Sequence, residues 1–219
     1  MPSGPGKALK SLLLISAISF LGAGFNHDAA KGSTQRSSDG RQYFPPGPSP
    51  ASSLFATLHF LGEPSLFEAA KDVNVVALRA SYFAPVPTHG VAVRLVVNAD
   101  GSGQITSAIL MDGNSGVKRA QNDVSAAEVA RLLQLLAKSD FWSIPSIVEE
   151  QRTDAAGHKL YVIDGPHWMV EAVRQGSFHY VYRYSPKTNP VAEIACALAR
   201  DVTNPNGSTI LSVFCSPRG

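Results

Sequence analysis

The sequence has few charged residues and few cysteines, and both shortages restrict what the protein can be. Only 16% of its 219 residues are charged, below the roughly 25% typical of soluble domains. The 19 Lys and Arg residues nearly balance the 17 Asp and Glu residues. This balance gives no strong positive field, so we expect no nucleic-acid partner. Two cysteines are too few for a disulfide-dense scaffold or a cysteine-based zinc site.

Familiar catalytic motifs are also missing from the sequence. It contains no Gly-x-Ser-x-Gly nucleophile elbow, no phosphate-binding loop and no dinucleotide glycine pattern. Its six histidines show no His-x3-His or His-Glu-x-x-His spacing, so we expect no metal and no cofactor. The loop at Asn98, Asp100 and Ser102 resembles a calcium loop, but Ile109 stands where a bidentate Glu is required. We interpret it as a glycine-rich hairpin turn.

Residues 1–24 have the features of a secretory signal peptide. Lys7 and Lys10 precede an apolar run over residues 12–21, and small residues follow at positions 22–24. The run is about half the ~20 residues that span a bilayer. We therefore expect cleavage rather than an uncleaved anchor, with no stable membrane span afterwards. Removal of residues 1–24 takes away two of the 19 basic residues and leaves 17 basic and 17 acidic residues. The expected location is periplasmic or secreted.

The rest of the chain divides into a linker and one domain. Residues 25–52 are rich in Ser, Gly and Pro and cannot bury enough apolar surface to offset the entropy of ordering, which predicts a disordered linker. Residues 53–219 are expected to form a single domain. A capping box at Ser125 and Glu128 predicts a helix to Lys138, and Pro190 predicts the first turn of a second helix.

The predicted fold class is α+β, an antiparallel sheet with two main helices packed against it. Alternating apolar residues and turn signals predict its strands over 73–83, 91–97, 104–111, 167–173 and 177–184, with a weaker strand over 159–163 and a short helix over 65–71.

The densest set of polar and aromatic residues lies in the hairpin over residues 164–186. A two-residue loop at Gln175 and Gly176 places His167 and His179 on opposite faces, where they cannot share a metal. A three-residue loop would bring them to the same side. The candidate binding residues of this hairpin are Trp168, Glu171, His179 and Arg183.

Three roles stay open for these four residues at this point. They could be structural, with Trp168 and Arg183 as a cross-strand cation–π pair. They could instead form a surface for a ligand or protein. Catalysis is the third role, although no completed acid–base set accompanies Glu171 or His179.

The hairpin carries a resemblance to a known group of proteins. The pattern Asp-Gly-x-x-Trp-x-x-Glu over residues 164–171, followed by Gly-x-Phe-His-x-Val-x-Arg-x-Ser-Pro over 176–186, resembles an uncharacterised family of bacterial secreted or periplasmic proteins. The segments 62–66, 91–105 and 141–145 are similar to the same family, whereas residues 154–163 fit it less well. The resemblance implies one domain over about residues 61–200, and no known activity, cofactor or partner.

Two hypotheses for the function follow. The first is an exported, non-catalytic domain that binds a protein or envelope component through the sheet face of Trp168, His179 and Arg183. The alternative is a hydrolase that uses Glu171 or His179 as a general base.

A disulfide between Cys196 and Cys215 is also predicted. Cys196 lies off the apolar stripe of the second helix, and a turn after residue 204 lets the apolar tail return along that helix. The alternative is two unrelated thiols.

Overall fold

The computed structural model describes ten ranges of the chain, all within one compact unit over residues 31–219. The ranges are 42–46, 52–84, 90–110, 116–148, 152–153, 156, 159–160, 166–184, 190–203 and 207–215. The expected signal peptide and most of the expected linker lie outside the described residues. Within the ranges that are described, no helix is long and apolar enough to cross a membrane.

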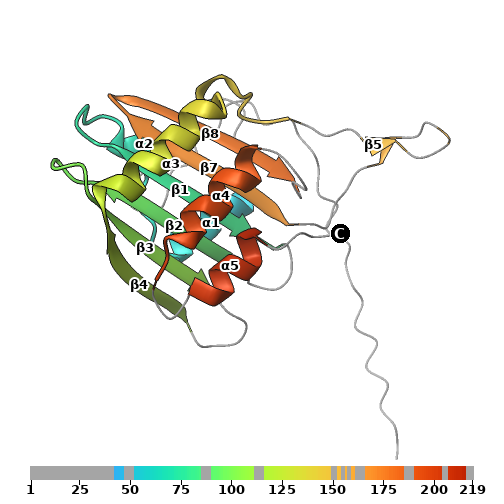
Figure 1. Cartoon of the computed structure of the whole chain (residues 1–219). Coiled ribbons are helices and arrows are strands. Elements are labelled where there is room, and N and C mark those ends of the chain that lie inside the picture. The colour runs from blue at the N-terminus through green and yellow to red at the C-terminus, as the bar shows by residue number, and fades with distance from the viewer. Residues whose placement is uncertain are drawn as a thin grey trace, which may run out of the picture. The chain divides into compact units, whose positions relative to one another are not determined.

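A six-stranded antiparallel sheet forms the centre of the domain, in the order β4-β3-β2-β1-β7-β8 (Figure 1). Its strands are β1 (Ala77–Phe83), β2 (Gly90–Val97), β3 (Gly103–Leu110), β4 (Val117–Val124), β7 (His167–Arg174) and β8 (Ser177–Tyr184). A separate two-stranded pair consists of β5 (Arg152–Thr153) and β6 (Lys159–Leu160). The α+β class and the antiparallel sheet are thus confirmed.

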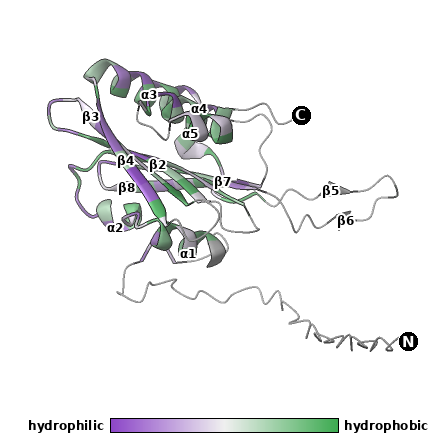
Figure 2. Cartoon of the chain, turned by 90° about the horizontal axis from the view of Figure 1, so that it is seen from below, coloured by the Kyte–Doolittle hydropathy of each residue, from purple (hydrophilic) through white to green (hydrophobic). Residues whose placement is uncertain are grey.

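Helices cover both faces of this sheet (Figures 1 and 2). One face carries α3 (Ala126–Lys138), α4 (Pro190–Arg200) and α5 (Gly207–Cys215), and we call it the α3–α5 face. The other carries α1 (Ser52–Phe60) and α2 (Leu66–Ala69), and we call it the α1–α2 face. The two predicted main helices are α3, with its capping box, and α4. The prediction of two main helices was incomplete, because α5 packs beside them and two more helices lie opposite.

The core extends further toward the N-terminus than the sequence suggested. Tyr43 and Phe44 are only 1% and 3% exposed and pack with Leu58 and Met169 on the α1–α2 face. The Tyr43 hydroxyl donates to the Glu63 carbonyl oxygen at 2.7 Å. The linker prediction for residues 25–52 is therefore wrong for residues 42–46, which belong to the folded domain.

The β7–β8 hairpin has the predicted two-residue turn. Gln175 and Gly176 both have positive φ angles, 51° and 76°, as a tight turn that matches the strand twist requires. Trp168 pairs with Arg183 as expected. His167 pairs with Phe83 and contacts Tyr182, whereas the residues that contact His179 belong to the α3–α5 face. The prediction of opposite faces for the two histidines is confirmed.

The predicted disulfide is present and joins two helices. Cys196 of α4 and Cys215 of α5 are bonded, with their Cα atoms 4.9 Å apart. Phe214 beside this bond packs edge-on against Trp168, with ring centroids 5.3 Å apart. The disulfide therefore fixes α5 over the aromatic part of the core.

Candidate functional site

A row of polar residues crosses the α1–α2 face of the sheet at one level. Cross-strand pairing aligns one residue from each strand, and opposed residues share a face. From β8 to β4, the row contains Tyr180, Glu171, Arg79, Arg94, Thr106 and Gln121. Its centre lies in the middle of the sheet, where apolar side chains are the norm. Such a row therefore needs internal partners.

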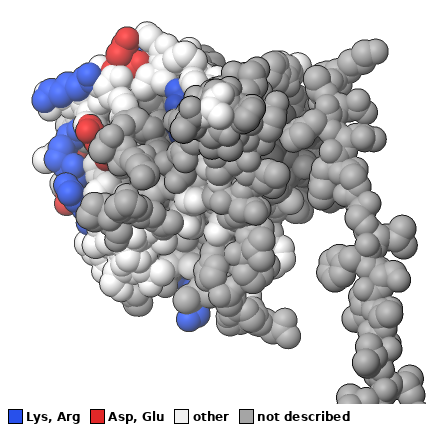
Figure 3. Space-filling model, turned by 90° about the vertical axis from the view of Figure 1, so that its right-hand side faces the viewer, with Lys and Arg blue, Asp and Glu red and all other residues white. Residues whose placement is uncertain are grey.

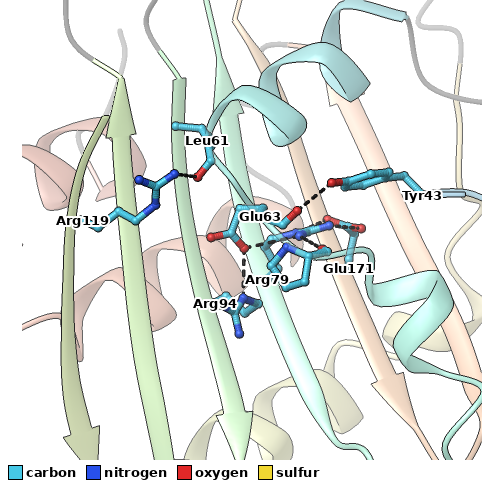
Figure 4. Close-up of polar contacts among 8 residues, drawn as sticks. Tyr43, Leu61, Glu63, Arg79, Arg94, Arg119 and Glu171 are labelled. Atoms are coloured by element: carbon cyan, nitrogen blue, oxygen red, sulfur yellow. Dashed lines mark hydrogen bonds and ion pairs between the residues drawn. The ribbon is translucent and has the colours of Figure 1, made fainter. Parts of the chain in front are cut away.

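Arg79 and Glu171 form a fully buried ion pair at the centre of this row (Figure 4). The Arg79 Nε donates to Glu171 Oε2 at 2.6 Å, and Nη2 donates to Oε1 at 2.7 Å. Burial opposes the charge of Arg79, but the carboxylates of Glu171 and Glu63 outweigh it and raise the pKa of Arg79. Burial raises the pKa of Glu171, against the opposing effect of Arg79. Both Glu171 oxygens are committed to this pair.

Three arginines, one each from β1, β2 and β4, bind the segment over residues 61–65 to the sheet (Figure 4). Arg94 Nε donates to Glu63 Oε2 at 3.0 Å, and Arg79 Nη1 lies 3.4 Å from the same oxygen. Arg79 Nη1 also donates to the Pro64 carbonyl at 2.7 Å, and Arg119 Nη2 to the Leu61 carbonyl at 2.7 Å. Glu171 therefore acts through Arg79 to hold the connection between α1 and α2.

His179 and Arg183 hold a second segment, on the α3–α5 face. His179 Nε2 donates to the Ile144 carbonyl at 2.9 Å, since a carbonyl can only accept. Arg183 Nη2 donates to the Pro145 carbonyl at 2.9 Å. The Tyr182 backbone N–H donates to the Ser146 carbonyl at 2.7 Å. The short helix η1 (Phe141–Ser143) and the residues up to 147 are thereby fixed along the edge of β8.

Three of the four candidate residues of the hairpin are buried. Trp168 is 4% exposed, Arg183 8% and Glu171 0%. Trp168 contacts Tyr82 and Phe214 edge-on. Only His179 of the four candidates is half-buried. Trp168, His179 and Arg183 lie on the α3–α5 face, with Trp168 directly opposite Arg183, whereas Glu171 lies on the α1–α2 face. Phe214 of α5 packs on Trp168, and the segment over residues 141–147 covers His179 and Arg183.

The segment held by His179 and Arg183 presents an exposed surface of its own. The Arg174 guanidinium lies over the Trp142 ring, 5.6 Å from its centroid, within cation–π range. Ser143 and Pro145 are exposed, and Val148 is 42% exposed. We call Trp142, Ser143, Pro145, Val148 and Arg174 the Trp142 surface.

Two smaller features bear on metal binding. In the part of the chain that the structure describes, no three His, Cys, Asp or Glu side chains gather in a way that could hold a metal ion. The turn at Asn98 is a hairpin turn, as interpreted: Gly101 has a φ of 85°, and Asp100 Oδ1 accepts from the Ser102 N–H at 2.9 Å and its hydroxyl at 2.6 Å. These bonds within the turn lower the pKa of Asp100.

The residues that give Glu171 its structural role were not predicted from the sequence. Arg79 and Glu63 were not singled out, although Arg79 is the one charged residue of the strand over residues 77–83. A charge of each sign in the interior of two largely apolar strands, Arg79 and Glu171, was the available signal for a buried ion pair.

Comparisons with known proteins add no relative. No protein-family model matches the chain, and no curated protein matches it significantly. The resemblance of the hairpin to a family of secreted or periplasmic proteins stays a prediction.

Proposed function

We propose that the chain is an exported, non-catalytic domain that binds a protein or cell-envelope component through the Trp142 surface. The observation that carries this proposal is the commitment of the two candidate general bases. Glu171 is 0% exposed and bonded to Arg79 through both oxygens. His179 uses Nε2 to hold the Ile144 carbonyl. A general base needs a free lone pair within reach of a substrate. Glu171 offers none, and the remaining lone pair of His179, on Nδ1, belongs to a half-buried ring that packs against Phe141 and Trp142. This geometry favours the binding hypothesis over the hydrolase.

Export is supported by two features of the chain. Residues 1–24 have the composition of a signal peptide. The Cys196–Cys215 disulfide joins helices of the folded domain, and such bonds persist in oxidising compartments. A periplasmic or extracellular location is therefore part of the proposal.

The Trp142 surface has the composition and the support that a binding site needs. Trp and Arg are the residue types that most often dominate the energy of a protein interface. Trp142 and Arg174 already contact one another, so less side-chain entropy is lost when a partner binds. His179 and Arg183 hold the backbone beneath them. On the face drawn in Figure 3, the Lys and Arg side chains of the described residues lie close to Asp and Glu side chains.

The proposal is tested by site-specific photo-crosslinking in cells of the native host. A photoreactive side chain replaces Ser143, and the matched control carries it at Gln134, an exposed position of α3. We expect a crosslinked partner from position 143 in the periplasmic or medium fraction and none from position 134. With the purified partner, Trp142→Ala and Arg174→Ala should each weaken binding about tenfold or more, the loss of a hot-spot residue.

Three outcomes would count against the proposal. Equal crosslinking from positions 143 and 134 would show that the Trp142 surface is not the binding site. Unchanged affinity in Trp142→Ala, with an unchanged circular dichroism spectrum, would do the same. Recovery of the full-length chain from the cytosol alone would contradict the proposal that the protein is exported.

A further inference from the structure

Strand β4 ends the sheet and differs from its neighbours. It pairs with β3 on one side, and no strand among the described residues pairs with its other side. It is largely hydrophilic, which Figure 2 shows by its purple colour. Its sequence, Val-Lys-Arg-Ala-Gln-Asn-Asp-Val, has basic residues near the start and an acidic residue near the end. The opposite edge of the sheet, at β8, is partly covered by Ile147.

The hydrogen bonds of the neighbouring strands show which backbone groups of β4 face outward. In an antiparallel sheet, alternate residues bond to the neighbour on either side. Val97 N–H donates to the Val76 carbonyl toward β1, and Asn98 N–H donates to the Ser102 carbonyl toward β3. Odd-numbered residues of β2 therefore bond to β1, and even-numbered residues bond to β3.

The same alternation continues through β3 to β4. The even-numbered residues of β3 bond to β2, so its odd-numbered residues bond to β4. In the pairing of β3 with β4, each odd-numbered residue of β3 is opposite an even-numbered residue of β4. The N–H and C=O groups of Arg119, Gln121 and Asp123 consequently point away from the sheet. These three side chains are exposed and lie on the α1–α2 face.

The outward edge is complementary to a second copy of itself. If two β4 strands pair antiparallel with Gln121 opposite Gln121 of the partner subunit, Arg119 lies opposite Asp123 of the partner subunit. The two-fold axis repeats this ion pair, as in any isologous interface. All three of these pairs use the outward backbone groups. Asp123 has a long contact of 3.5 Å with Gln104, and Arg119 uses Nη2 toward Leu61, so both retain capacity for a partner.

The charged side chains of β4 favour one of the possible pairings between two β4 strands. A register centred on Ala120 places Arg119 opposite Gln121 of the partner subunit and loses both ion pairs. A parallel pairing in register opposes Arg119 to Arg119 of the partner subunit, and opposed like charges destabilise a sheet. Charged side chains usually protect an edge strand from other strands. The mixed signs of β4 disfavour these alternatives and favour its own antiparallel copy centred on Gln121.

We propose that β4 is a self-association edge, through which two copies of the domain form one continuous antiparallel sheet centred on Gln121. The partner that this surface fits is a second copy of this chain. The contact involves one strand from each copy, so the dimer is concentration-dependent, as small interfaces are. The surface is separate from the Trp142 surface, and its test is independent of the proposed function.

The first test is oxidative crosslinking of variants of the chain that each carry one introduced cysteine and keep the native disulfide intact. In Gln121→Cys, the two introduced residues face each other with Cα atoms about 5.5 Å apart, within the range of a disulfide. The control is Lys118→Cys on the same strand, whose two copies lie six residues apart in the register, about 20 Å. We expect a covalent dimer of Gln121→Cys on a non-reducing gel and monomer of Lys118→Cys.

The second test exchanges the charges. Sedimentation velocity of the unmodified domain should show a monomer–dimer equilibrium. Asp123→Arg should raise the dissociation constant at least tenfold, because Arg119 then faces an arginine. The double variant Arg119→Asp/Asp123→Arg should restore dimerisation. A monomer at every concentration up to several hundred micromolar, equal crosslinking of the two cysteine variants, or no restoration by the double variant with an unchanged circular dichroism spectrum would overturn the proposal.

Discussion

Arg79 joins parts of the protein that are far apart in sequence. Its partner Glu171 lies 92 positions away, and its other contacts reach Glu63 and Pro64. Removal of the cation leaves the buried carboxylate of Glu171 without its partner and leaves Glu63 with Arg94 alone. We expect Arg79→Met to lower the free energy of unfolding by about 3–5 kcal/mol, measured by urea denaturation.

Arg131 provides the matched control for this substitution. Its ion pair with Asp201 is also formed by an arginine, but the Arg131 side chain is 47% exposed. Arg131→Ala should cost at most about 1 kcal/mol. The double variant Arg79→Met/Glu171→Leu should recover part of the loss in Arg79→Met, since it removes one unpaired carboxylate. Equal effects of Arg79→Met and Arg131→Ala would show that the buried pair does not anchor the segment over residues 61–65.

The sequence identified hairpin residues that make specific contacts, but it did not reveal the roles of those residues. Glu171, His179 and Arg183 do have specific partners. The sequence suggested an outward surface because the hairpin alone does not show what lies over it. The partners of these residues are backbone carbonyls at Ile144 and Pro145 and the guanidinium of Arg79. Such contacts depend on tertiary structure, which local patterns do not contain.

At the scale of the elements, the stability of helix α5 depends on its disulfide bond to α4. It has nine residues, too few for stable isolated helix formation. The disulfide to α4 closes a loop with a sequence separation of 19, which contributes about 3 kcal/mol in the chain-entropy model. We expect Cys196→Ser/Cys215→Ser to lose about this much stability. Hydrogen exchange should become faster in α5 (Gly207–Cys215) and change least in β1 and β2.

The prediction is tested by where hydrogen exchange becomes faster after the disulfide is lost. The reduced unmodified domain should behave like the double serine variant, which separates loss of the bond from any effect of the serine side chains. Uniformly faster exchange throughout the sheet would show that the bond supports the whole domain rather than α5. No change in the exchange of α5 would show that the packing of Ile210 and Phe214 alone holds the helix.

The elements that the sequence predicted are those with a strong local pattern. The β7–β8 hairpin has a two-residue turn between alternating strands, and α3 has a complete capping box and an apolar stripe. Three of the missed elements have a clear physical reason. Strand β4 is polar because only β3 pairs with it among the described residues. Helix α5 is a short apolar run stabilised by tertiary contacts and the disulfide, and α1 follows a proline-rich stretch that indicated a linker.

At the scale of the whole molecule, two half-buried histidines couple folding to pH. Burial lowers the pKa of His167, whose Nδ1 forms a hydrogen bond with the Tyr182 hydroxyl. Burial also lowers the pKa of His179, although the carbonyls of Ile144 and Phe141 oppose this effect. The two side chains lie on opposite faces of the sheet. Protonation of either one therefore disturbs a different layer of the same domain.

The sign of the pH effect follows from these lowered pKa values. In the unfolded chain both histidines titrate near 6.5, so below this pH the unfolded state binds more protons than the folded state. Their stabilising contribution is complete above pH 6.5 and is lost as pH falls through the folded pKa. We expect the melting temperature to decrease between pH 7 and pH 5. His179→Gln retains a donor toward Ile144, and His167→Asn retains an acceptor for Tyr182. Each should reduce the decrease, and the double variant should reduce it most. An equally steep decrease in the double variant would show that carboxyl groups, and not these histidines, carry the acid sensitivity of the fold.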